Sequence, residues 1–116
     1  MSDIDLQEKS RRFSFRVKHF VRLYPKDFVK YEISHQLLRC GMSVGANTRA
    51  AFRGRSKKEF VAKLGIVVEE SDECIYWLEM LSDEENVDKK ELLRLQKEAT
   101  SLMKIFVSIR NKHRSL

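Results

Sequence analysis

Proline and glycine are scarce in this chain of 116 residues, which holds one proline and four glycines. A β-sandwich or β-barrel needs a turn about every 8–12 residues, and those turns draw on both residue types. The scarcity argues against such folds and favours long helices. Hydrophobic residues make up 42% of the chain and charged residues 34%, which is typical of a folded domain. We therefore expect a single domain over residues 1–116.

Long apolar runs and cysteine frameworks are also missing. No apolar run approaches the roughly 20 residues that span a bilayer. The first five residues, Met-Ser-Asp-Ile-Asp, lack the basic-then-apolar order of a signal peptide. Cys40 and Cys74 show no CxxC spacing, and both fall on apolar helix faces. We interpret them as reduced core thiols of a cytoplasmic protein with no membrane segment.

Signatures of catalysis and metal binding are absent. The sequence has no GxSxG, HExxH, Walker lysine or GxGxxG motif. One Glu-x-x-His pair occurs, Glu32 with His35, whereas a carboxylate-bridged di-metal site in a bundle needs two such pairs and two further glutamates. The acids between Glu69 and Glu73 lie mainly off the apolar face, which favours a solvated or interface surface over a cation site. We expect no enzyme, no metal site and no cofactor.

Four segments carry apolar residues at spacings of three and four, the period of amphipathic helices. They run from about Asp5 to Leu23, from about Asp27 to the region of Ala50, from Ser56 to Leu81, and onward from Asp88. Pro25 marks the first turn. The predicted core positions are Leu6, Phe13, Val17, Phe20 and Tyr24; Ile33, Leu37, Cys40, Val44, Asn47 and Ala51; Phe60, Leu64, Val67, Ser71, Cys74, Leu78 and Leu81; and Leu92, Leu95, Ala99, Leu102, Phe106 and Ile109. This pattern predicts an all-α protein, an up-and-down antiparallel four-helix bundle.

Several residues have local structural roles in this scheme. Gly41 and Gly45 lie inside the second segment, where glycine weakens a helix, and they indicate close approach of a neighbouring helix or a local distortion. Asn47 falls on the apolar stripe, so we expect it to fix helix register or stitch the following bend rather than bind a ligand. Ser56 and Glu59 have the spacing of a reciprocal helix-capping box. Trp77 is interpreted as core or interface filler rather than a base-stacking platform.

Charge is unevenly distributed. Residues 66–91 hold ten acids against Lys89 and Lys90, a local net of −8, so the remainder carries +14 within the overall +6. Such segregation suits self-association, in which the acidic face of one subunit meets the basic face of another. Two solvated helix faces of opposite sign are the alternative.

Five cations gather around the bend between the second and third segments: Arg49, Arg53, Arg55, Lys57 and Lys58. Lys57 and Lys58 stand in the first turn of a helix, where the helix dipole disfavours positive charge. That placement is compatible with a nearby anion, and the functional interpretation is contact with a nucleic-acid backbone. The alternative is pairing with the protein's own acids across a subunit interface.

Four short motifs carry a family resemblance: Gln36-Leu37-x-Arg39, Ser43-Val44-x-Ala46-Asn47, Arg53-x-Arg55-Ser56-x-x-Glu59-Phe60 and Leu64-Gly65-Ile66. Together they resemble the four-helix-bundle proteins first noticed in intervening sequences of large-subunit ribosomal RNA genes, once mislabelled as ribosomal proteins. The chain is also similar, more distantly, to the accessory bundle protein of diversity-generating retroelements, a basic pentamer that binds nucleic acid and a reverse transcriptase.

The resemblance implies a ring-like homo-oligomer, most simply a homopentamer, with RNA or DNA as a partner. One departure stands in the second motif. Many members continue Asn-Ile-Ala-Glu-Gly, whereas Thr48-Arg49-Ala50-Ala51 follows Asn47 here. No role of the missing acid is carried over to Ala50. The sequence thus predicts a non-enzymatic oligomer that contacts nucleic acid, or alternatively a protein–protein scaffold.

Overall fold

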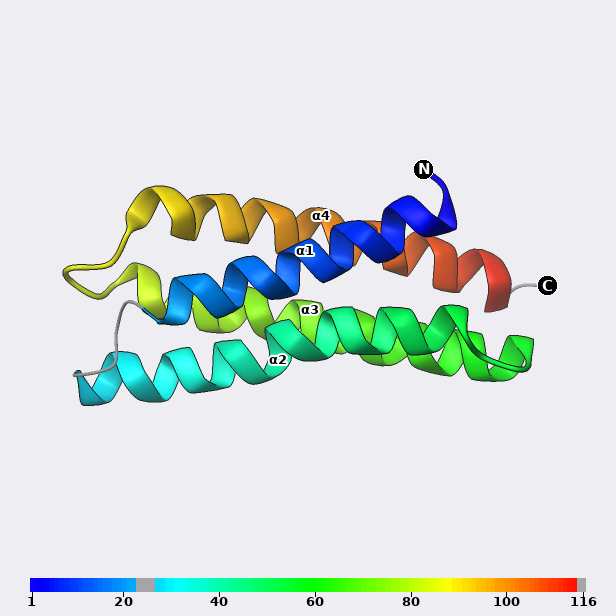
Figure 1. The fold of residues 1–116 in the computed structure, drawn as a ribbon, viewed down its shortest axis with the longest axis horizontal. Helices are drawn as coiled ribbons and strands as arrows, with labels where there is room; N and C mark the ends of the chain where they lie inside the picture. The colour runs from blue at the N-terminus through cyan, green and yellow to red at the C-terminus, as the bar shows by residue number, and fades with distance from the viewer. Residues whose placement is uncertain (23–26, 115–116) are drawn as a thin grey trace.

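Four α-helices account for most of residues 1–22 and 27–114, which are the residues described by the computed structural model of this chain. They are α1 (Asp3–Val21), α2 (Phe28–Phe52), α3 (Lys57–Ser82) and α4 (Lys89–Arg114). Consecutive helices run antiparallel in a rod whose Cα trace measures 47 × 20 × 20 Å (Figure 1). The predicted all-α bundle is confirmed, whereas the predictions for Leu23, Tyr24 and Pro25 lie outside the described residues. No described helix is both long and apolar enough to cross a membrane.

The core follows the predicted stripes closely. Phe13, Phe20 and Phe106 are among its largest fully buried side chains, and burying a side chain of this size stabilises the fold by about 1.5–3 kcal/mol. Ile33, Phe60 and Ile109 are half-buried and pack against this core. Cys40 and Cys74 are free thiols in the core, as expected.

One core prediction in α2 is wrong by a residue. Thr48 is buried where the sequence pattern placed Asn47, which is only half-buried. The buried face of α2 continues from Cys40 through Val44 to Thr48 in steps of four. Thr48 satisfies its hydroxyl by donating to the carbonyl of Val44 at 2.7 Å, so a polar residue enters the core without an unpaired donor.

The two glycines of α2 lie where α1 approaches closely, one of the two explanations that the sequence offered. A Cβ on Gly41 would lie 2.7 Å from Cγ1 of Val17. The Ser14 hydroxyl donates to the carbonyl of Gly41 at 2.7 Å and accepts from the N–H of Gly45 at 3.2 Å. These are the two groups that an α-helix normally pairs with each other. Ser14 therefore inserts into the hydrogen-bond ladder of α2, a known cause of local helix distortion.

Polar side chains cap the start of each helix. Asp27 accepts from the N–H of Lys30 at 3.0 Å at the start of α2, and Asp88 accepts from the N–H of Glu91 at 3.1 Å at the start of α4. The sequence pattern missed a capping box at α1, where Ser2 and Asp5 exchange hydrogen bonds of 3.1 and 3.3 Å. These bonds lower the pKa of Asp5.

The predicted capping box at α3 is half right. The Ser56 hydroxyl accepts from the N–H of Glu59 at 3.1 Å. The Glu59 carboxylate returns to the N–H of Arg55 at 2.7 Å rather than to that of Ser56. Glu59 therefore reaches one residue further back and ties the bend itself to the first turn of α3.

Candidate nucleic-acid interface

The bend between α2 and α3, around which the five predicted cations gather, lies at one end of the rod, beside the C-terminal end of α4 (Figure 1). Aromatic rings fix this arrangement. Phe60 of α3 meets Phe52 of α2 with ring centroids 5.4 Å apart, and it meets His113 of α4 at 4.9 Å, both edge-to-face. His113 is oriented by a 2.9 Å hydrogen bond between its Nδ1 and the carbonyl of Ile109. The end of α4 therefore packs against the bend.

All five predicted cations are exposed: Arg49, Arg53, Arg55, Lys57 and Lys58. Within residues 1–22 and 27–114, none of them forms an ion pair with the chain's own acids. They do not share one hollow, however. Arg49 lines a groove between α1 and α2, whereas Lys57 lines a second hollow together with Lys112 and His113. The structure thus adds Lys112, which the sequence pattern had assigned only to the end of a helix.

The acids offered as alternative partners are partly engaged within the chain. Arg39 of α2 pairs with Glu70 at 3.3 Å and also with Glu73, both on α3. Glu69 and Asp72 remain exposed on the same helix. The acidic surface left for another molecule is therefore smaller than the local net charge of −8 suggests.

Asn47 and Ser56 act locally. The amide of Asn47 donates to the carbonyl and the hydroxyl of Ser43 at 3.0 and 2.8 Å, so its hydrogen bonds stay within α2 and do not stitch the bend. Ser56 caps α3 as described above. Both residues belong to the family motifs, and their hydrogen bonds serve the fold.

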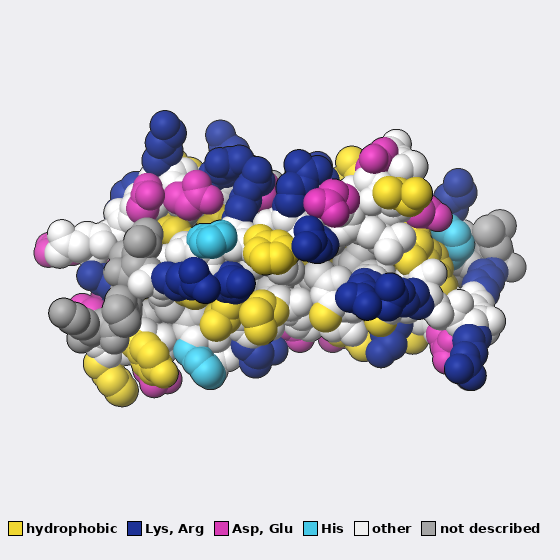
Figure 2. Space-filling view, viewed as in Figure 1, with side chains coloured by type: hydrophobic (Ala, Val, Ile, Leu, Met, Phe, Trp, Pro, Cys, Tyr) yellow, Lys and Arg dark blue, Asp and Glu magenta, His cyan; other side chains and the backbone are white. Residues whose placement is uncertain are grey.

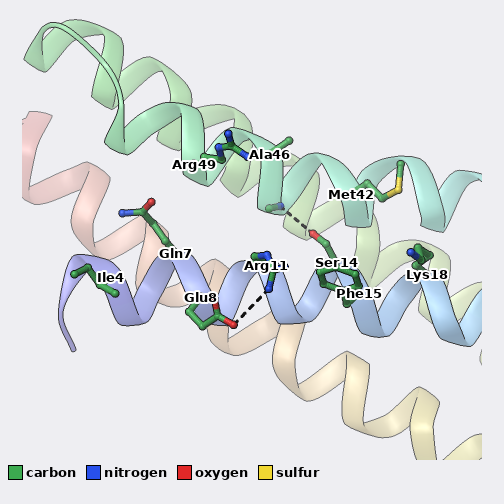
Figure 3. A pocket seen from close by; sticks show the side chains of 11 residues that line it. Ile4, Gln7, Glu8, Arg11, Ser14, Phe15, Lys18, Met42, Ala46 and Arg49 are labelled. Atoms are coloured by element: carbon green, nitrogen blue, oxygen red, sulfur yellow. Dashed lines mark hydrogen bonds and ion pairs between the residues drawn. The ribbon is translucent and has the colours of Figure 1, made fainter.

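The α1/α2 groove brings in residues that the sequence analysis did not single out. It encloses about 640 Å³, and Arg11, Phe15 and Lys18 line its α1 side (Figure 3). Lysine and arginine side chains outnumber acidic ones on this face of the molecule (Figure 2). The sequence contained a sign of this groove wall, because residues 11, 15 and 18 share one helix face beside the core stripe. Only the docking of α2 turns that face into the wall of a groove.

The described residues include no group of three or more His, Cys, Asp or Glu side chains placed to hold a metal ion. The pair Glu32 and His35 thus has no further ligand among them. His35 instead stacks on Tyr31, with ring centroids 6.3 Å apart.

Comparison with known proteins gives a match to the family described as 23S rRNA-intervening sequence protein, over residues 2–108. No curated protein matches the chain. A crystal structure of a protein of unknown function from the S23 ribosomal protein family of Bacteroides thetaiotaomicron is similar, with a TM-score of 0.86 and 31% sequence identity. That similarity covers 96% of this chain and 99% of the other.

Proposed function

The chain belongs to the family of 23S rRNA-intervening sequence proteins, and we propose that it is a non-enzymatic, self-associating bundle that binds RNA through its basic surfaces. The observation that supports this most is the state of the bend cations: five exposed side chains in one region, none of them ion-paired within the described chain. Unpaired cations at one end of a rod suit a polyanion, since each phosphate contact releases condensed counterions.

The bend also presents its cations on a firm support. Phe52, Phe60 and His113 hold the ends of α2, α3 and α4 together beneath the surface. Arg53 caps the C-terminus of α2, with its N–H directed to the carbonyls of Ala50 and Ala51. The cationic side chains that project from this rigid backbone are well placed for phosphate contacts. Such contacts position a protein on nucleic acid without reading its sequence.

A second candidate is a protein–protein scaffold, and one feature of α3 favours it. Tyr76 is 51% exposed and Ile66 is 36% exposed, on a helix that also carries the exposed acids Glu69 and Asp72. Apolar side chains among charges are typical of an interface between proteins. In this case the acidic α3 surface of one copy meets the bend of another, in keeping with the homopentameric ring that the family resemblance implies.

Two triple variants separate these functions. Arg53, Arg55 and Lys58 are changed to glutamine in the first, and Lys90, Lys97 and Lys104 of α4 in the second. The net charge falls equally in both, so only the position of the lost charge differs. All six side chains are exposed. Binding to labelled RNA is measured by fluorescence anisotropy over a range of salt concentrations, and the mass of each variant by light scattering.

We expect the bend variant to bind more weakly across RNA sequences. Its slope of log affinity against log salt should flatten by up to about 0.9 per lost duplex contact, or about 0.7 per single-strand contact. The α4 variant should bind nearly as the parent does. An equal loss of RNA affinity in both variants would show that affinity depends on net charge and not on the position of the cations. Dissociation of the bend variant into monomers would instead support the scaffold.

A further inference from the structure

An exposed aromatic ring lies between two cations on the wall of the α1/α2 groove. Phe15 is 41% exposed. The guanidinium carbon of Arg11 lies 4.8 Å from the centroid of its ring, and the Nζ of Lys18 lies 5.1 Å from it. The three side chains leave α1 one turn apart, so the groove presents cation, ring and cation in succession (Figure 3).

The opposite wall comes from α2 and carries Met42, Ala46 and Arg49. Met42 is 48% exposed and adds an apolar surface. Arg49 adds a third cation, and unlike Arg11 it forms no ion pair among the described residues. The Ser14 hydroxyl at the base of the groove is engaged by Gly41 and Gly45. The walls rather than the base therefore offer groups to a ligand.

The groove is positive overall. Three cations and one acid, Glu8, line it, which leaves a net charge of +2. Glu8 lies within 3.7 Å of Arg11 and 3.8 Å of Arg12, so two guanidinium groups offset its charge. Gln7 supplies a side-chain amide, which can both donate to and accept from a base edge.

We propose that this groove binds single-stranded RNA, with one base stacked on Phe15 and the flanking phosphates on Arg11, Lys18 and Arg49. The inference rests on the proposed function. It adds a second RNA-binding surface, the groove, which stacks a base, whereas the bend contacts phosphates. Cation–π contacts at exposed sites are weaker than stacking of a base on an aromatic ring. A base can therefore displace a cation from Phe15, and the released cation meets the phosphate next to that base.

Continuity with the bend favours RNA over a second copy of this chain as the occupant. Arg49 belongs to the groove and also to the bend cations, so a strand held at the bend can continue into the groove. The acidic helix α3 of another copy is the competing occupant, since it would supply carboxylates to the same cations and the exposed side chains of Tyr76 and Ile66 to Phe15.

Matched variants test the proposal. Phe15→Leu removes the ring and keeps an apolar side chain, and Tyr76→Leu removes an exposed ring on α3, outside the groove. Arg11→Gln and Arg12→Gln form a second pair, because both arginines contact Glu8 and are similarly exposed, at 63% and 61%, while only Arg11 lines the groove. Each protein is titrated into a labelled 12-nucleotide single-stranded RNA and into the corresponding duplex.

Phe15→Leu should weaken single-strand binding about tenfold, the order expected for one lost base stack, and should change duplex binding less than about twofold. Phe15→Trp should retain single-strand binding. Arg11→Gln should bind the single strand more weakly than Arg12→Gln. Tyr76→Leu should bind as the parent does.

Three results would contradict single-strand binding in the groove while leaving the proposed function intact. Phe15→Leu would bind the single strand as the parent does, or Phe15→Leu and Tyr76→Leu would lose equal affinity. In the third case the parent would bind the duplex but not the single strand. A change in molecular mass of Phe15→Leu in light scattering would show that a second copy covers the groove. Failure of the parent to bind either RNA would overturn the proposed function as well.

Discussion

Ser14, Gly41 and Gly45 set the distance between α1 and α2, and thereby the depth of the groove between them. The absence of side chains on the glycines lets the Ser14 hydroxyl reach the backbone of α2. The sequence pointed to this contact, because two glycines inside an otherwise continuous helical pattern require a reason. It could not name Ser14 or Val17 as the partners, since the pairing depends on the register of one helix against the other.

Gly41→Ala should destabilise the protein. The added methyl group would overlap with Val17, a fully buried and stiff β-branched residue, and such overpacking costs about 1–3 kcal/mol. The better helix propensity of alanine, about 1 kcal/mol, offsets part of this loss. Gly65→Ala is the control, because a Cβ there meets nothing within 4 Å, and it should stabilise the protein. Equal stabilisation of both variants in urea denaturation would contradict the close contact.

The two core thiols form a contact that the sequence did not predict. Cys74 Sγ lies 3.1 Å from Cys40 Sγ, and Cys40 in turn lies 3.4 Å from the carbonyl of Leu37. The hydrogen bond to Cys40, reinforced by burial, raises the pKa of Cys74 well above its ordinary value. Because the thiolate is the reactive form, Cys74 in the folded protein should resist thiol reagents.

The raised pKa of Cys74 predicts a loss of stability at alkaline pH. In the unfolded chain a cysteine titrates near pH 8.5, so above that pH the unfolded state releases a proton that the folded state keeps. The free energy of unfolding should then fall as pH rises, by up to about 1.4 kcal/mol per pH unit. Urea denaturation between pH 8 and 10 measures this slope, and Cys74→Ala should reduce it. An unchanged slope in that variant would count against the assignment.

At the scale of single helices, most of the architecture could be read from the sequence. The spacing of the core residues predicted all four helices, and the stripes of α3 and α4 held along their length. The pattern failed in α2, where glycines and small polar residues leave the apolar signal weak and Thr48 replaces Asn47 in the core. The Thr48 hydroxyl bonds back within its own helix and so enters the core with its donor satisfied, which hydropathy does not register.

The cap of α3 provides a test at the same scale. Ser56→Ala should destabilise the protein by about 1 kcal/mol, because the N–H of Glu59 loses its acceptor. Ser108→Ala is the control, since Ser108 is exposed in the middle of α4, and it should change stability by less than about 0.5 kcal/mol. Equal midpoints for Ser56→Ala and the parent in urea denaturation would show that the cap does not stabilise the bend.

For the whole molecule, the distribution of charge along the rod matters more than the net charge. The loop between α3 and α4 lies at the end opposite the bend (Figure 1). It belongs to residues 66–91, whose local net charge is −8, whereas the bend carries five cations. The sequence revealed this partition. It could not reveal the α1/α2 groove, which exists only once α1 and α2 are packed together, and it drew attention to Trp77 rather than Phe15. In the structure Trp77 donates to Glu73 at 3.1 Å and packs against the core.

Charge separation of this kind predicts self-association. Light scattering at moderate salt should give a mass several times the 13.7 kDa of one chain, and five times that mass for the ring implied by the family resemblance. High salt should weaken the assembly, because contacts between exposed charges are screened. A mass of one chain at moderate salt would contradict the prediction.

The most direct test of RNA binding is the affinity of the unmodified protein, at a known oligomeric state, for a labelled structured RNA at increasing salt. We predict binding at low salt, with log affinity falling linearly against log salt, because backbone contacts release counterions. DNA of the same length should bind by the same cations. Absence of binding to either polymer at low salt, or binding that does not respond to salt, would contradict the account.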